Sequence, residues 1–95
     1  MPTKTVPFTD AGIGSLPNDK PVVYKVITQG GRNNYTGTAQ RGRVQERLQE
    51  HLPGGKDPIP GAKVQIEQMP SIADARAREG RIIKRSQPPY NRQGK

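Results

Sequence analysis

The sequence contains no cysteine and no tryptophan, and it has a single phenylalanine. Without cysteine, neither a disulfide nor a thiolate metal site can form. No apolar run approaches the roughly 20 residues that cross a membrane, and the N-terminus lacks the apolar segment of a secretory signal. These absences lead us to expect a soluble, cytoplasmic protein without a membrane partner.

Apolar residues of every kind are scarce. Only 29% of the 95 residues are hydrophobic, so the chain has material for one domain with a thin core. Ten prolines and eleven glycines place much of the chain in turns and connections. Residues 1–20 have few apolar side chains and carry the turn-forming residues Pro2, Pro7, Gly12, Gly14, Pro17, Asn18 and Asp19. We therefore expect a flexible N-terminal arm over residues 1–20 and one folded domain over residues 21–95.

The first part of that domain has the pattern of a β-hairpin. Residues 22–28 are apolar and mostly β-branched, which is typical of a strand. The glycine-rich residues 29–33 favour a turn, and residues 34–38 resume as a second strand. A hairpin over residues 21–38 is the prediction.

The second part alternates between helix and strand. Apolar positions in residues 40–52 recur with a helical period, and residues 63–67 alternate as a half-exposed third strand. Ser71 is a suitable N-cap for a second helix that ends near Arg85, and the chain beyond Pro88 is expected to be extended. The order β-β-α-β-α predicts an α+β domain with a small three-stranded antiparallel sheet flanked by helices.

The net charge of +8 is large for this length and unevenly placed. Residues 41–95 hold 12 of the 16 Lys and Arg but also 6 of the 8 Asp and Glu. A basic side chain placed on a phosphate releases condensed counterions, so this charge favours a nucleic acid partner. A merely solubilising surface is the less favoured explanation of the charge, and a structural ribosome- or RNA-associated protein is a further alternative to which the charge alone would point.

One carboxylate interrupts the apolar stripe of the second predicted helix. The stripe consists of Ile72, Ala75, Ile82 and Ile83, and Glu79 lies in its middle. A carboxylate is almost never buried without a partner. Helix geometry alone favours a structural salt bridge to an arginine, and a divalent cation is the other solution.

Two further pairs of side chains could take part in chemistry. Arg47 and His51 are one helical turn apart at the rim of the predicted core. Arginine binds phosphate through two parallel hydrogen bonds, and histidine exchanges protons near neutral pH. Tyr24 and Tyr35 lie on neighbouring strands, and a phenol beside a cation can have a lowered pKa and activate water. Taken singly, each is more often a surface or packing residue.

Together these residues form an ordered pattern. Val22-Val23-Tyr24 is followed by Tyr35-Thr36-Gly37, whose tyrosine comes eleven residues after the first. The later members follow in the order Arg47, His51, Glu79 and Asn91. This layout, over residues 21–93, resembles the GIY-YIG nuclease superfamily, and Pro88-Pro89-Tyr90-Asn91 resembles the closing segment of its bacterial excision-repair members.

The chain departs from the family pattern at three positions. Val22 and Val23 stand in place of glycine and isoleucine, and Thr36 stands in place of isoleucine. All three are good strand residues, so the fold expectation is unchanged. Gly37 is retained, which fits a position where the backbone approaches a phosphate.

The resemblance implies a divalent-metal-dependent endonuclease. Glu79 would hold Mg²⁺ or Mn²⁺, which prefers oxygen ligands and keeps several waters. Arg47 would neutralise charge on the phosphate, and Tyr24 would activate the attacking water. Tyr35 and His51 would tune or relay the proton. Asn91 would anchor the C-terminal segment against the site.

Several neighbours are assigned to nucleic acid binding. Arg41, Arg43 and Arg47 all follow Gly37, and Arg47 is chosen as catalytic for its spacing to His51, with Arg43 as the alternative. The assigned nucleic-acid contacts are Arg41, Arg43, Gly37 and Tyr90.

The chain shows no zinc finger or helix-turn-helix, so loops must read the target. Single-stranded DNA is favoured, because its bases are open to stacking on an aromatic ring such as Tyr90. Double-stranded DNA or RNA, a nuclease toxin domain and a non-catalytic nucleic-acid-binding module remain alternatives.

Overall fold

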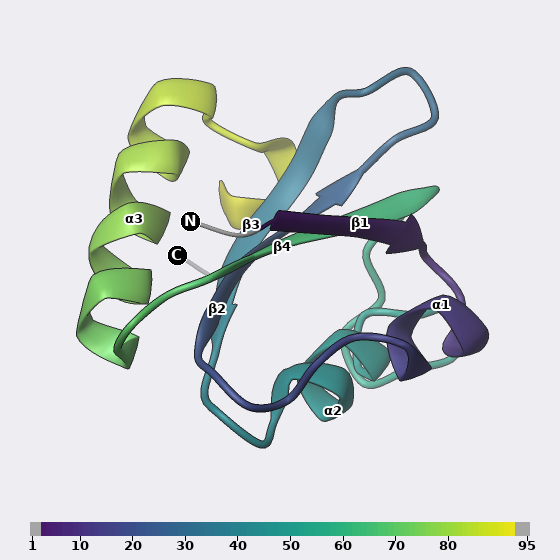
Figure 1. The fold of residues 1–95 in the computed structure, drawn as a ribbon. Coiled ribbons are helices and arrows are strands. Elements are labelled where there is room, and N and C mark those ends of the chain that lie inside the picture. The colour runs from purple at the N-terminus through teal and green to yellow at the C-terminus, as the bar shows by residue number, and fades with distance from the viewer. Residues whose placement is uncertain (1–2, 93–95) are drawn as a thin grey trace.

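A four-stranded antiparallel sheet with the order β1-β4-β2-β3 forms the centre of the molecule (Figure 1). The computed structural model of the chain describes residues 3–92. The strands are β1 (Thr3–Pro7), β2 (Val22–Ile27), β3 (Asn33–Ala39) and β4 (Lys63–Gln68). The helices are α1 (Asp10–Gly14), α2 (Val44–Gln49), α3 (Ile72–Ser86) and the 3₁₀ helix η1 (Pro89–Arg92). The expected α+β class is therefore confirmed.

Helices cover both faces of the sheet, because β2 alternates its side chains between two apolar clusters. Val22, Tyr24 and Val26 point into the main cluster, which α1 and α2 complete. Val23 points to the opposite face and packs with Ala75 of α3. In Figure 1, α3 accordingly stands apart from α1 and α2. Within residues 3–92, no helix has the length and apolar character needed to cross a bilayer.

The predicted strand count was wrong, and so was the loose N-terminal arm. Residues 3–7 form β1, which pairs antiparallel with β4 so that Val6 faces Val64. Phe8, Ile13 and Leu16 are buried in the main cluster. The segment is short, and Pro7 is tolerated in it because β1 is an edge strand. Its order comes from contacts with the rest of the chain, which its composition does not reveal.

The predicted hairpin is confirmed. β2 pairs with β3 so that Tyr24 faces Gly37 and Val26 faces Tyr35. β2 is also paired with β4, which makes it an inner strand of the sheet. Tyr24 therefore lies on an inner strand of the sheet, and Tyr35 lies on the neighbouring edge strand.

The predicted helices are present with different ends. α2 starts at Val44 rather than Gln40, because the preceding turn places Gly42 at a φ of 83°. α3 is capped as expected, with the Asp74 amide donating to the Ser71 hydroxyl at 3.1 Å. The chain beyond Pro88 is not extended but turns into η1.

Candidate active site

A buried tyrosine and a buried histidine share a hydrogen bond at the centre of the candidate site. Tyr24 Oη lies 2.8 Å from His51 Nε2, and His51 Nδ1 lies 2.9 Å from the carbonyl oxygen of Asp57. A carbonyl oxygen only accepts, so Nδ1 must carry a proton. In the neutral imidazole, Nε2 is then the acceptor, and the Tyr24 hydroxyl donates to it. The hydroxyl hydrogen of Tyr24 therefore points at the unprotonated Nε2 of His51.

Tyr35 completes a group of three rings. Its ring centroid lies 6.1 Å from that of Tyr24 and 4.9 Å from that of His51. Tyr24 and His51 are almost completely buried, whereas Tyr35 is only partly buried. Two strands and the segment that follows α2 thus bring together three residues that the sequence separates by up to 27 positions.

Burial raises the pKa of the Tyr24 phenol, and the neighbouring Tyr35 adds to the shift. The charge of Arg47 acts in the opposite direction but does not outweigh burial. The pKa of Tyr35 is raised for the same main reason. Beside Arg47, the pKa of Tyr24 is therefore raised and not lowered, because desolvation of the phenolate exceeds the stabilisation by this cation. Such a phenol gives up its proton only to a neighbouring acceptor, and His51 Nε2 lies in hydrogen-bond contact with it.

Arg47 and Glu79 approach the phenols from different helices. Arg47 lies on α2, and the pKa of its guanidinium is raised chiefly by the charge of Tyr24. Glu79 lies on α3, partly buried between Ala75 and Ile82, and its carboxylate raises the pKa of both Tyr24 and Tyr35. The two tyrosines therefore lie within electrostatic range of one cation and one carboxylate.

Glu79 is a fitting ligand for a hard divalent cation. The described residues contain no group of three or more His, Asp or Glu that could hold a metal ion by themselves. Mg²⁺, however, is commonly held by one or two carboxylates together with substrate phosphates and water. Glu79 offers one carboxylate of this kind, near enough to Tyr24 and Tyr35 to raise the pKa of both phenols.

Gly37 is required by the position of Tyr24. A Cβ on residue 37 would lie 2.6 Å from Tyr24 Oη and 3.0 Å from a ring carbon of Tyr35. Within the described chain, the group nearest to this glycine is thus the Tyr24 phenol. A contact between Gly37 and a phosphate stays a prediction.

Asn91 ties the C-terminal segment to the edge of the sheet. Its Oδ1 accepts from the Thr36 amide at 2.7 Å, and its Nδ2 donates to the Thr36 carbonyl at 2.8 Å. β3 is an edge strand, so Asn91 satisfies the two backbone groups that a further strand would otherwise pair. Thr36 lies between Tyr35 and Gly37, and the two hydrogen bonds hold the backbone next to the phenols.

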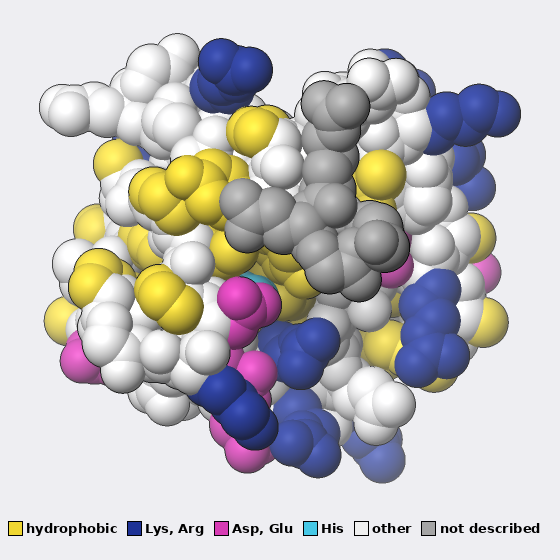
Figure 2. Space-filling view, turned by 180° about the vertical axis from the view of Figure 1, so that it is seen from behind, with side chains coloured by type: hydrophobic (Ala, Val, Ile, Leu, Met, Phe, Trp, Pro, Cys, Tyr) yellow, Lys and Arg dark blue, Asp and Glu magenta, His cyan; other side chains and the backbone are white. Residues whose placement is uncertain are grey.

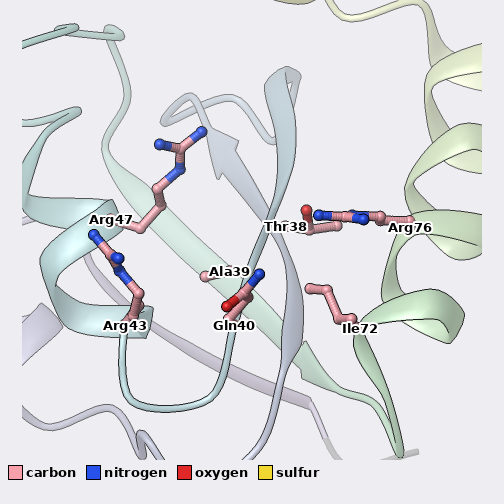
Figure 3. Close-up of a pocket in the computed structure, with 7 residues that line it drawn as sticks. All are labelled: Thr38, Ala39, Gln40, Arg43, Arg47, Ile72 and Arg76. Atoms are coloured by element: carbon pink, nitrogen blue, oxygen red, sulfur yellow. The ribbon is translucent and has the colours of Figure 1, made fainter.

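A basic cleft adjoins these residues. It has a volume of about 310 Å³ and lies over the end of β3 between α2 and α3. Figure 3 shows Arg43 and Arg47 on the α2 side and Arg76 reaching from α3 toward Thr38. From behind, Lys and Arg side chains lie together with several Asp and Glu side chains on the face where the one histidine of the chain is just visible (Figure 2). The lining residues are Thr38, Ala39, Gln40, Arg43, Arg47, Ile72 and Arg76.

The remaining residues assigned to nucleic acid binding have different environments. Arg43 lines the cleft and is paired with Glu46 at 3.3 Å. Arg41 is exposed on the loop before α2 and is not part of the cleft wall. Tyr90 is partly buried and packs against the main core cluster, which leaves only part of its ring for a base.

Electrostatics distinguishes the two candidate arginines. The charge of Arg47 lowers the pKa of both Tyr24 and Tyr35, against the larger effect of burial. Arg43 has no comparable link to the described phenols and is held by its pair with Glu46.

Two contributors were not anticipated from the sequence. Arg76 lines the cleft, and the Asp57 carbonyl fixes the proton position on His51. Arg76 could have been found, since it is four residues after Ile72 and three before Glu79 and so shares their helical face. A backbone carbonyl in a loop carries no sequence signal of this kind.

Comparison of the chain with protein-family models, with curated proteins and with solved structures finds no match.

Proposed function

We propose that the chain is a divalent-metal-dependent endonuclease of the GIY-YIG type that hydrolyses phosphodiester bonds in DNA, with single-stranded DNA as the favoured substrate. The observation that carries the proposal is the hydrogen bond from Tyr24 to His51 Nε2. A phenol that donates to a buried imidazole, beside an arginine and a carboxylate, is organised for proton transfer.

The proton path follows from this hydrogen bond. As a water molecule attacks phosphorus, its proton passes to Tyr24 Oη and the phenol proton passes to His51 Nε2. The new P–O bond forms as the bond to the leaving sugar oxygen breaks, and that oxygen takes a proton from solvent. Because burial raises the pKa of Tyr24, the two transfers must be concerted rather than start from a free phenolate. The Asp57 carboxylate, 3.9 Å from His51 Nδ1, stabilises the imidazolium that results.

The charged residues act on the phosphate. Arg47 neutralises charge that develops on the non-bridging oxygens and orients the group against the phenol. Glu79 is the residue that would hold Mg²⁺ or Mn²⁺. When bound there, such an ion supplies Lewis-acid polarisation of the phosphate and stabilisation of the leaving oxygen.

The cleft supports a flexible single strand as substrate. Its volume of about 310 Å³ is at the small end of ligand sites and suits a nucleotide better than a whole duplex. Its wall carries three arginines and no acidic residue among the described lining. Such a wall would attract the phosphates of a strand laid across the end of β3.

The test is cleavage of single- and double-stranded DNA and RNA, with Mg²⁺ or Mn²⁺ and with EDTA. We expect metal-dependent cutting of single-stranded DNA, and a loss of at least about 100-fold in Glu79→Gln with binding retained. The matched control is Asp10→Asn, which makes the same charge change at an exposed position of α1. Full activity of Glu79→Gln would overturn the metal assignment. If no substrate is cut, the non-catalytic binding module becomes the favoured alternative.

A further inference from the structure

The α3 wall of the basic cleft carries an arginine that the proposed proton path does not use. Arg76 projects from α3 toward Thr38 of β3, across the cleft from Arg43 and Arg47 (Figure 3). It is exposed, and within residues 3–92 it has no ion pair and no side-chain hydrogen bond. The guanidinium is thus available for an anion.

The other two arginines of the cleft are already engaged. Arg43 pairs with Glu46 at 3.3 Å, and Arg47 pairs with Glu50 at 3.5 Å and acts electrostatically on Tyr24. Their acidic partners, Glu46 on α2 and Glu50 directly after it, are not among the described residues of the cleft wall. The cleft therefore keeps a net positive wall.

Arg76 and Glu79 have a fixed spacing. They are three residues apart on α3, so their Cβ atoms lie about 5–6 Å apart on the same helical face. A phosphate on the Arg76 guanidinium is consequently the neighbour of a phosphate placed between Glu79 and Arg47. Ile72, one turn before Arg76, adds an apolar surface at the same wall, which suits a sugar or a base.

From this arrangement we propose that the cleft is a second phosphate subsite, in which Arg76 binds the phosphate adjacent to the scissile one on the same strand. The inference rests on the proposed nuclease function for the identity of the scissile phosphate. Arg76 is a substrate-binding residue in this scheme, and it takes no part in proton transfer. The substrate must then extend at least one nucleotide beyond the cleaved bond.

The experiment measures binding separately from cleavage. Glu79→Gln protein is titrated with a fluorescent single-stranded thymidine oligonucleotide at several salt concentrations, with and without Arg76→Gln. We expect Arg76→Gln to weaken binding about 5- to 30-fold and to reduce the salt slope by about 0.7, as for one lost phosphate contact. Arg76→Lys keeps the charge and should keep the slope while losing part of the affinity.

The matched control is Arg32→Gln, which removes the same charge at the opposite end of β3. It should change the affinity less than twofold. Equal effects of Arg76→Gln and Arg32→Gln, or no effect of either, would overturn the subsite. Cleavage by the unmodified chain is scored in parallel, so that a protein that binds through Arg76 but cuts nothing contradicts only the nuclease proposal.

In the cleavage arm, Arg76→Gln should raise KM in proportion to the loss of affinity and leave kcat within about threefold. An oligonucleotide whose adjacent linkage is an uncharged methylphosphonate should show the same rise in KM with the unmodified protein. It should show no further rise with Arg76→Gln. Additive losses from the two changes would contradict a direct contact.

Discussion

Gly37 lies so close to Tyr24 that a Cβ at residue 37 would be 2.6 Å from the phenol oxygen. The two residues face each other across the β2–β3 pair. The glycine therefore sets the position of the Tyr24 ring, which takes the proton of water in the proposed path, and this relationship gives the first prediction.

Gly37→Ala should displace the Tyr24 ring and break its hydrogen bond to His51. We expect a loss of about 1–3 kcal/mol in the free energy of unfolding, because the added carbon overpacks a buried site. Cleavage should fall at least about tenfold. Denaturant unfolding and cleavage assays measure the two effects.

Gly80→Ala is the control for that substitution. Gly80 lies in α3, and a Cβ added there would have nothing within 4 Å of it. Alanine at this position should stabilise the helix by about 0.5–1 kcal/mol. Unchanged stability and activity in Gly37→Ala would show that the phenol does not occupy the place described.

Tyr24→Phe and His51→Ala should each lower kcat by about 10²- to 10⁴-fold, because each removes one member of a two-proton relay. The double substitution should be no slower than the slower single one, since both residues serve the same transfer. Single-turnover rates measure this. Multiplicative losses in the double variant would mean that the two side chains act independently.

Alkaline titration should report the raised pKa of Tyr24. The folded-state pKa lies above the ordinary value of 10.0, so the native state holds the phenol proton more tightly than the unfolded chain does. Its contribution to stability is complete below about pH 10 and is lost as the pH rises beyond it. Phenolate absorbance from Tyr24 should therefore appear only together with unfolding.

In Tyr24→Phe, the fall in unfolding free energy above about pH 10 should be less steep. Circular dichroism recorded together with the phenolate absorbance shows whether Tyr24 ionises with or without unfolding. Ionisation of all three tyrosines while the fold stays intact would disprove the buried position of Tyr24.

Asn91→Ala should release the C-terminal segment from β3. It leaves the Thr36 amide and carbonyl without their partner, at a cost of about 1–3 kcal/mol. Hydrogen exchange of the Thr36 amide should speed up accordingly. Asn91→Asp keeps the acceptor for the Thr36 amide but loses the donor to the Thr36 carbonyl. Its loss of stability should lie between those of the unmodified protein and Asn91→Ala. It should exceed that of Asn91→Ala if the new carboxylate repels the carbonyl. Unchanged exchange in Asn91→Ala would rule out the anchoring role.

Elements defined by local signals could be predicted from the sequence, and elements defined by distant contacts could not. The β2–β3 hairpin follows from β-branched runs around a glycine turn, and α3 follows from Ser71 and its apolar stripe. β1 was missed because five residues with a proline carry little strand signal. Its order depends on pairing with β4, some 60 residues later.

The same distinction holds for the candidate site. The sequence order of Tyr24, Tyr35, Arg47 and Glu79 suggested a shared site, and the fold brings them within electrostatic range. The direction of the phenol pKa shift could not be predicted, because it depends on how completely the ring is buried. The tautomer of His51 likewise depends on a loop carbonyl.

The strand order has a consequence for how the chain reaches its native state. β4 inserts between β1 and β2, although it follows both of them in the sequence. During synthesis the β2–β3 hairpin can form early, but β1 has no pairing partner until residue 68 has emerged. Closing so long a loop is slow relative to hairpin formation. Glu79 and Asn91 come later still, so a nascent chain holds Tyr24, Tyr35 and Arg47 before it has the carboxylate proposed to hold the metal ion.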